Sequence, residues 1–356
     1  MSDPRLVADA HLDLAWNALD WNRDLMKPVA DIRQFERQFV DAVPGDCTVS
    51  WPELRRGRVG LIIATLLPRL QRKEKPRTFF QSREAGYGAC HGQLAYYRAM
   101  ERRGVLRFLE DREMLQQHVQ HWLQPDVGEQ PLGIVLSMEG ATAILEPEQV
   151  AEWYAAGLRI VGPAHYGPNQ YCHGTGSEGG LTDQGRRLLR EMERVGMLLD
   201  VTHLADQSFW EALDQYSGPV LASHHNCRAL VPGDRQLADE QIQALAERGA
   251  VIGAALDCWM LQPGWQIGHS DPADVSLENV VDHIDHICQL LGTARHCGIG
   301  SDLDGGFGKE QTPHDLDTIA DLVRIAEILD RRGYSASDID GILYRNWVDF
   351  FTRAWG

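Results

Sequence analysis

Acidic and imidazole side chains alternate near the start of the chain, in the stretch VADAHLDL at residues 7–14. On a β-strand every second side chain points to the same face, so Asp9, His11 and Asp13 would share one face. A carboxylate beside an imidazole can bind a metal ion, hold a proton or form a structural hydrogen bond. The rest of the sequence has to distinguish these uses.

Imidazole or carboxylate side chains also follow five later apolar runs that are typical of strands. They are Glu139 after GIVLSM, His165 after IVGPA, His203 after GMLLDVT, His224 and His225 after PVLAS, and Asp302 and Asp304 after CGIGS. Each residue alone is more simply read as structural: a histidine with satisfied hydrogen bonds, a glutamate near a helix start, or acids that shape a turn. Their joint occurrence at strand ends favours one functional rim.

Such a rim needs a cation, because buried imidazoles and carboxylates packed together would otherwise repel one another and lose solvation. Nitrogen and oxygen ligands without thiolates suit Zn²⁺, with Mn²⁺, Fe²⁺ or Co²⁺ as alternatives. The number of candidate ligands favours two divalent ions over one. None of the four lysines ends a predicted strand, so a carboxylate must bridge the ions, and Glu139 is the natural choice.

Alternating strand and helix patterns indicate how these residues are positioned. Strands are predicted at residues 6–11, 59–66, 132–138, 158–164, 197–202, 220–223, 250–255 and 297–300. Amphipathic helices are predicted at 182–195, with Thr182 at its start, 239–248 and 277–291. Buried parallel strands that alternate with helices predict a (β/α)8 TIM barrel of the metallo-dependent hydrolase type. We expect residues 1–356 to form a single barrel domain, with helical inserts at about 15–57 and 68–130.

Composition excludes several other classes of protein. A net charge of −17 argues against nucleic-acid binding, and the short basic stretch at 69–77 (RLQRKEKPR) is predicted to be a solvated loop. The N-terminus lacks a signal-peptide pattern, and no apolar stretch is long enough to span a membrane. The seven cysteines include no C-x-x-C pair, which indicates reduced thiols and a cytoplasmic location.

The motifs DAHLD, SMEG, LDVTH, SHHNCRAL, GIGSDLDG and NWVDFF, in this order, resemble the membrane (renal) dipeptidase family of binuclear zinc peptidases. The resemblance covers nearly the whole chain. It implies hydrolysis of the amide bond of small dipeptides, including substrates with C-terminal D-residues. Dimers are common in this family, so it also implies a homodimer.

The resemblance assigns metal ligands to five residues. His11 and Asp13 would bind the first ion, Glu139 would bridge both ions, and His203 and His224 would bind the second. His224 rather than His225 is the implied ligand, because the family motif runs Ser-His-Ser-x-x-Arg and aligns with SHHNCR. His225 therefore replaces the usual serine of the motif and leaves a second imidazole near the implied ligand.

Three further residues receive catalytic or binding roles from the resemblance. Asp302 would carry a proton, His165 would polarise the substrate, and Arg235 would hold the substrate carboxylate. Two alternatives stay open at this point. One is a related metal-dependent amidohydrolase acting on N-acyl amino acids or lactams, and the other is a non-catalytic metal-binding protein.

Overall fold

The computed structural model describes residues 5–39, 45–69 and 80–356. These residues form a nine-stranded, all-parallel sheet. The strands are β1 (Val7–Leu12), β2 (Val59–Leu66), β3 (Leu106–Phe108), β4 (Leu132–Glu139), β5 (Leu158–Gly162), β6 (Leu198–Asp200), β7 (Val220–Leu221), β8 (Ile252–Ala254) and β9 (Cys297–Ile299).

Eight of these strands form a nearly closed barrel in chain order. The hydrogen-bonded path runs β7-β6-β5-β4-β2-β1-β9-β8, and a single parallel bridge between Ala222 and Ile252 joins its two ends. β3 lies off this path and pairs with the first residues of β4, while β5 pairs with the last ones. The predicted (β/α)8 architecture is therefore confirmed.

The strands are buried on both faces, which explains their nearly continuous apolar sequences. Every residue of β1, β2, β4 and β5 is buried. At the junction of β7 with β8 and β9 the backbones approach closely, because a Cβ atom at Gly253 or Gly300 would collide with the carbonyl oxygen of Ser223. Glycine at both positions therefore lets the barrel narrow there.

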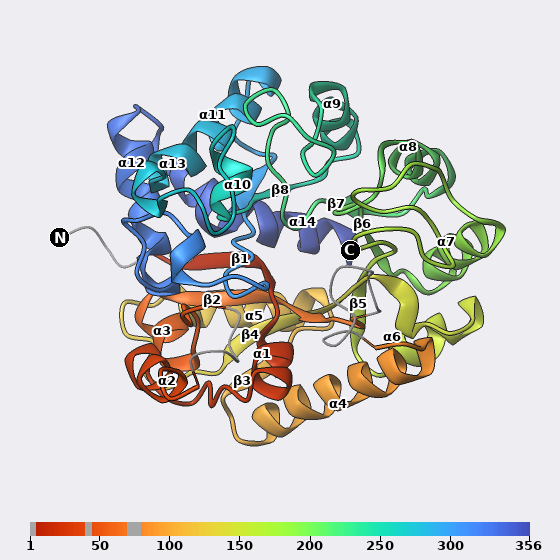
Figure 1. The fold of residues 1–356 in the computed structure, drawn as a ribbon, viewed down its shortest axis with the longest axis horizontal. Coiled ribbons are helices and arrows are strands. Elements are labelled where there is room, and N and C mark those ends of the chain that lie inside the picture. The colour runs from red at the N-terminus through yellow and green to blue at the C-terminus, as the bar shows by residue number, and fades with distance from the viewer. Residues whose placement is uncertain (1–4, 40–44, 70–79) are drawn as a thin grey trace.

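Helices surround the strands, as Figure 1 shows for α4, α7, α8, α9 and α11. The helices are α1 (Leu14–Asp20), α2 (Val29–Glu36), α3 (Trp51–Arg56), α4 (Arg83–Arg102), α5 (Arg112–Trp122), α6 (Val150–Ala155), α7 (Asp183–Val195), α8 (Asp206–Gln215), α9 (Asp239–Glu247), α10 (Cys258–Leu261), α11 (Leu277–Leu291), α12 (Ile325–Arg331), α13 (Ala336–Asp340) and α14 (Asn346–Ala354). In the part of the chain that the structure describes, no helix is both long and apolar enough to cross a bilayer.

The three predicted helices are confirmed, with ends that agree to within one residue. α7 begins after Thr182, whose hydroxyl accepts a hydrogen bond from the backbone N–H of Gly185 at 3.0 Å. α11 has the predicted bounds, and its buried positions include Val280, Ile284 and Ile287. Capping and apolar spacing therefore located these helices from sequence alone.

The second insert contains the helices α4 and α5 and also a strand that was not predicted, β3, whose three residues are too few to show a period. One sequence expectation for this insert is wrong. Arg69 was expected in a solvated loop but is only 8% exposed, because its guanidinium stacks on Trp16 and pairs with Asp20 at 3.1 Å. The rest of the basic stretch lies outside the described residues.

Candidate metal centre

The ends of the strands supply the candidate site residues at a regular offset. His11 and Glu139 belong to β1 and β4 themselves. Six other strands, β2, β5, β6, β7, β8 and β9, each have an ionisable residue three positions after their last residue. These six residues are Arg69, His165, His203, His224, Asp257 and Asp302. Because parallel strands end at one edge of the barrel, this offset brings side chains from distant parts of the chain together.

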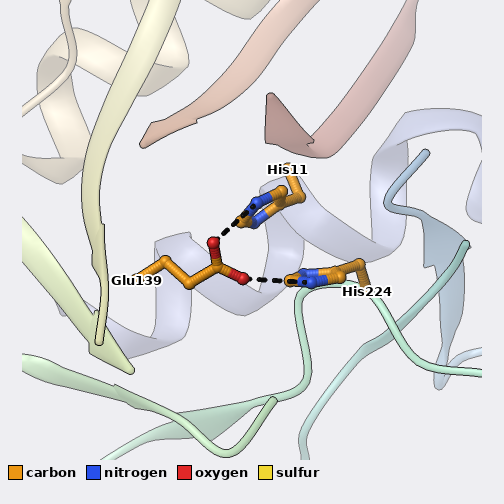
Figure 2. A group of neighbouring side chains, drawn as sticks. All are labelled: His11, Glu139 and His224. Atoms are coloured by element: carbon orange, nitrogen blue, oxygen red, sulfur yellow. Dashed lines mark ion pairs between the residues drawn. The ribbon is translucent and has the colours of Figure 1, made fainter. Parts of the chain in front are cut away.

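Glu139 lies at the centre of the site. One carboxylate oxygen, Oε1, lies 3.2 Å from His203 Nε2 and 3.3 Å from His224 Nε2. The other oxygen, Oε2, lies 3.8 Å from Nε2 of both His11 and His165. Figure 2 shows the carboxylate of Glu139 between the rings of His11 and His224, with one oxygen directed at each.

Within the described part of the chain, three overlapping groups have ligand atoms close enough to share a metal ion. They are His11 with Glu139 and His224, Glu139 with His165 and His203, and His11 with Asp13 and Asp302. Glu139 belongs to two of the groups and His11 to two, so the groups form one continuous cluster. The structure thus brings together seven of the eight site residues predicted from sequence.

Two hydroxyl groups contact the far nitrogens of the histidine rings. Thr175 Oγ1 lies 2.9 Å from His203 Nδ1, and Ser223 Oγ lies 2.9 Å from His224 Nδ1. If each hydroxyl receives the Nδ1 proton, the Nε2 lone pairs point into the cluster. Such contacts fix ring orientation in metal sites. Sequence reasoning missed both; Ser223 could have been found as the neighbour of His224, but Thr175 lies in an irregular loop with no local signal.

Burial keeps these histidines neutral. Desolvation, reinforced by the charge of Arg235, lowers the pKa of His11 to about 3. The same two causes lower the pKa of His203 and of His224 well below the ordinary value, with the histidine neighbours adding to the effect. Neutral imidazoles retain the lone pair that a metal ion requires.

The carboxylates respond in the opposite direction. Burial raises the pKa of Asp13 to about 7, and it raises the pKa of Glu139 well above its usual range, with repulsion from Asp13 and Asp302 next in importance. These acids are therefore crowded, desolvated and repelled by one another. A divalent cation would relieve that conflict and favour the ionised forms.

Buried polar atoms without partners test whether the residues fit a cation. Three buried atoms of the cluster have no hydrogen-bond partner among the described residues: both ring nitrogens of His11 and Oδ1 of Asp13. Buried polar atoms are almost always satisfied, so such atoms gathered at one point indicate a missing partner. Neutral imidazoles and carboxylates are the donors that Zn²⁺ and similar ions accept, so the site fits a divalent metal.

The backbone is strained at two of these positions. His203 and Asp302 adopt left-handed conformations, with φ of 67° and 58°. Non-glycine residues avoid this region, and such outliers concentrate at functional sites. The local backbone therefore turns sharply to direct both side chains into the cluster.

The residues expected to contact substrate differ in how far they are exposed. The side chains of His165 and Asp302 are 27% and 16% exposed, against 8% for Glu139. Arg235 is buried; its Nη2 donates to the carbonyl of His224 at 3.0 Å, whereas its buried Nη1 has no hydrogen-bond partner among the described residues. Arg235 is thus the one predicted site residue outside the three metal-ligand groups.

The neighbouring His225 and Asp9 take no part in the groups. His225 is buried, and its backbone N–H donates to the carbonyl of Gly253 at 2.7 Å. Asp9 accepts hydrogen bonds from the backbone N–H groups of His11 and Ser301, at 3.1 and 2.9 Å. Asp9 therefore links the end of β9 to β1, the strand that also carries His11.

Sequence reasoning missed two of the six ionisable strand-end residues. Arg69 follows β2 and Asp257 follows β8, and both are buried. The charge of Arg69 acts on Asp13, while that of Asp257 acts on Asp302. The common offset of three residues is counted from the observed strand ends, and the less exact strand ends predicted from sequence do not show it.

Comparison with known proteins gives one family over almost the full length. The family model of membrane dipeptidase, peptidase family M19, matches residues 3–354. A Klebsiella pneumoniae protein described as an uncharacterized protein in the pqqA 5' region is 31% identical over 63% of this chain and 83% of its own length. Dipeptidase tcpJ of Claviceps purpurea is 32% identical over 55% of this chain, but the match spans only 44% of that protein.

Solved structures support the same fold. A crystal structure described as the dipeptidase AC, a metallo peptidase, has a TM-score of 0.80 at 22% identity and covers 99% of both chains. A metallo peptidase from Rhodobacter sphaeroides, liganded with a phosphinate mimic of the dipeptide L-Ala-D-Ala, has a TM-score of 0.79 at 22% identity and covers 99% of this chain and 100% of that one. The predicted resemblance is confirmed: this chain belongs to the membrane dipeptidase family, peptidase family M19.

Proposed function

We propose that the protein is a metal-dependent dipeptidase that hydrolyses the amide bond of small dipeptides, including dipeptides with a C-terminal D-residue. The observation that carries the proposal is the position of Glu139, whose carboxylate lies 3.2–3.8 Å from the Nε2 atoms of four histidines. The family membership and the dipeptidases among its relatives support peptide-bond hydrolysis. The dipeptide mimic bound by the Rhodobacter sphaeroides relative supports the substrate class.

Two divalent ions, most simply Zn²⁺, would be held by the cluster. His11 and Asp13 would bind one ion, His203 and His224 the other, and Glu139 would bridge them. The Nε2 atoms of His203 and His224 are 3.3 Å apart, which suits two ligands of one ion. When bound, such ions supply Lewis acidity that polarises a carbonyl group and makes water a better nucleophile at neutral pH.

Asp302 would move the proton during hydrolysis. Burial and the neighbouring Asp13 raise the pKa of Asp302 well above that of an ordinary aspartate, so this carboxyl binds a proton more readily than an exposed one would. In our proposal it takes a proton from the attacking water and delivers it to the leaving amine. It lies at the partly open side of the cluster, 3.8 Å from His11 Nε2, where a substrate can reach it.

His165 and Arg235 would hold the substrate. His165 would donate from Nε2 to the oxygen on which negative charge develops, a type of contact worth about 10²–10³ in rate. Arg235 would bind the terminal carboxylate of the dipeptide through Nη1, which has no other partner among the described residues. A guanidinium suits this task because it can form two parallel bonds to a carboxylate.

Metal analysis followed by a substrate panel tests the proposal. We expect elemental analysis to find about two equivalents of zinc, chelation to lower the thermal midpoint, and the metal-loaded protein to hydrolyse L,L- and L,D-dipeptides. The panel should include N-acyl amino acids and lactams as the alternative substrates. Turnover of those compounds alone would favour a related amidohydrolase, and tight metal binding without any turnover would favour a non-catalytic role.

The resemblance also leads us to propose a homodimer, and the seven free cysteines lead us to propose a cytoplasmic location. Light scattering on the purified protein tests the first proposal, since the mass of the chain is 39.9 kDa. Cell fractionation of the full-length protein tests the second.

A further inference from the structure

Asp257 is the one acidic strand-end residue to which the proposed mechanism gives no role. It follows β8 at the same offset as His203, His224 and Asp302 follow their strands. It is buried, with 6% of its surface exposed. It therefore belongs to the same rim as the candidate metal ligands and the proton carrier.

The simplest structural role for this aspartate is absent. Asp257 occupies the N-cap position of α10, yet its side chain makes no capping hydrogen bond to that helix. Instead, Gln311 Nε2 lies 2.8 Å from both carboxylate oxygens, and Trp259 Nε1 donates to Oδ2 at 2.7 Å. The carboxylate is held in place by neutral donors, one from α10 itself and one from the segment that follows β9, and no salt bridge to it is present among the described residues.

The loop that carries Asp257 is tied to the loop that carries Arg235. Gln236, next to Arg235, donates through Nε2 to the carbonyl of Met260 at 2.9 Å. Asn226 donates through Nδ2 to the carbonyl of Ala255 at 3.0 Å and accepts from its N–H at 3.1 Å. These bonds fix the chain on both sides of Asp257 relative to the chain around Arg235.

Arg235 and Asp257 influence each other but do not pair. Burial raises the pKa of Asp257 to about 7, and the positive charge of Arg235 partly opposes that rise. The salt bridges among the described residues include none between these two side chains. Buried charges are normally paired, so a ligand that carries both signs could complement these two opposite charges at one rim.

We propose that Asp257 is a specificity-determining residue that binds the cationic side chain of the C-terminal residue of a dipeptide, such as lysine or ornithine. The inference rests on the proposed function, because it takes Arg235 as the group that holds the terminal carboxylate. In a dipeptide the nitrogen of the C-terminal residue belongs to the amide bond and carries no charge. A cation close to the terminal carboxylate must therefore come from the side chain of that residue. The N-terminal ammonium lies on the other side of the scissile bond.

Two substrates that differ only in charge test this proposal. L-Ala-L-Lys and L-Ala-L-norleucine have side chains of nearly the same length, and only lysine carries the ammonium group. We expect kcat/KM of the metal-loaded full chain to be about tenfold higher for the lysine substrate, as one additional charge-assisted contact would give. The reversed dipeptides, L-Lys-L-Ala and L-norleucyl-L-Ala, control for a cation at the N-terminal residue.

Asp257→Asn should reduce the preference for L-Ala-L-Lys over L-Ala-L-norleucine to about one. The ratio of the two rates does not depend on how much of the variant is folded. Asp183→Asn is the matched control, because the side chain of Asp183 is fully exposed on α7, and this variant should keep the preference. Asp257→Glu retains the charge and should keep a ratio above one.

Three results would overturn the inference. They are a wild-type ratio at or below one, a ratio that Asp257→Asn leaves unchanged, and an effect of Asp257→Asn on the reversed dipeptides instead. Hydrolysis of L-Ala-L-norleucine in any of these cases leaves the proposed function standing. Failure of the metal-loaded protein to hydrolyse any dipeptide would overturn both proposals together.

Discussion

Asp302 and Asp304 follow the same strand, two residues apart, and both adopt left-handed backbone conformations, with φ of 58° and 63°. Their surroundings differ sharply. Asp304 accepts hydrogen bonds from the backbone N–H groups of Thr48 and Val49, at 2.8 and 3.0 Å, and lies 3.2 Å from Nη1 of Arg23. Among the described residues no such donors reach the Asp302 carboxylate, whose Oδ1 lies 3.8 Å from Nε2 of His11.

The comparison separates two uses of a buried acid. Around Asp304, Arg23 also pairs with Glu36 and donates to Asn17, at 2.6 and 2.7 Å, so the charges are satisfied within the protein. Around Asp302 the charges remain uncompensated until a cation or substrate arrives. The partners of an acid, more than its burial or its backbone conformation, therefore indicate whether it stabilises the fold or serves chemistry.

The largest expected effect is on the activity of Asp302→Asn. Removing the proton carrier should lower kcat/KM for dipeptides by about 10²–10⁴, which is the usual contribution of general acid–base catalysis. The thermal midpoint of the variant should not fall, because the substitution removes a partly buried charge that has no hydrogen-bonded partner among the described residues. Unchanged hydrolysis would show that Asp302 does not carry the proton.

Asp304→Asn should give the opposite pattern. Breaking the buried pair with Arg23 should lower the free energy of unfolding by about 3 kcal/mol. The folded variant should keep its metal content and lose far less activity than Asp302→Asn. Urea unfolding, with kcat/KM measured on the same samples, checks both halves. A stable but inactive variant would contradict the distinction drawn between the two acids.

Arg235→Lys tests the residue that we propose binds the substrate carboxylate. Lysine keeps the charge but cannot form the two-pronged contact, so KM for free dipeptides should rise about tenfold to a hundredfold. The corresponding C-terminal amides should be affected much less. Arg187→Lys, a change at a half-exposed surface residue, provides the control. Equal losses on acids and amides would exclude the carboxylate role.

A buried histidine far from the rim should give the smallest effect, seen only in stability. His118 in α5 contacts the carbonyl of Gly60 through Nε2 at 2.7 Å, and burial lowers its pKa to about 4 from an ordinary 6.5. Between these values the unfolded chain binds more protons than the folded one. Stability is therefore complete above pH 6.5 and decreases as the pH falls towards 4.

The size of this decrease is at most about 3 kcal/mol, from 1.36 kcal/mol per pKa unit. Urea unfolding at pH 7.5 and pH 5 should show a smaller difference for His118→Gln than for the wild type. His121→Gln, at an exposed position of the same helix, should behave like the wild type. A pH dependence that His118→Gln leaves intact would have to come from other groups.

The strand ends explain how much of the site could be predicted from sequence. Apolar runs marked the strands. Acidic or imidazole side chains, which are rarely buried, marked most of the strand ends, as at Glu139 and His203. The family motifs then supplied roles that remain predictions for the individual residues. The contacts among His11, Glu139 and His224 span most of the chain, and only the closed barrel brings them together.

The missed features lack a local signal of this kind. β3 is three residues long, and it exists because it pairs with β4. Arg69 looked like part of a solvated basic stretch, since the sequence does not reveal that Trp16 and Asp20 come to meet it. Asp257 was overlooked because the sequence does not reveal that Gln311, more than fifty residues later, comes to contact its carboxylate.

The junction of β7 and β8 has a consequence for how this barrel can change over evolution. Backbone hydrogen bonds there extend only from Ala222 to His225, and beyond them the carboxamide of Asn226 both donates to and accepts from the same residue, Ala255. A side-chain amide thus imitates a peptide group. Loops on either side can acquire new lengths while this single asparagine is retained, whereas an aspartate in its place would lose the donor and loosen the part of the wall that carries Asp257.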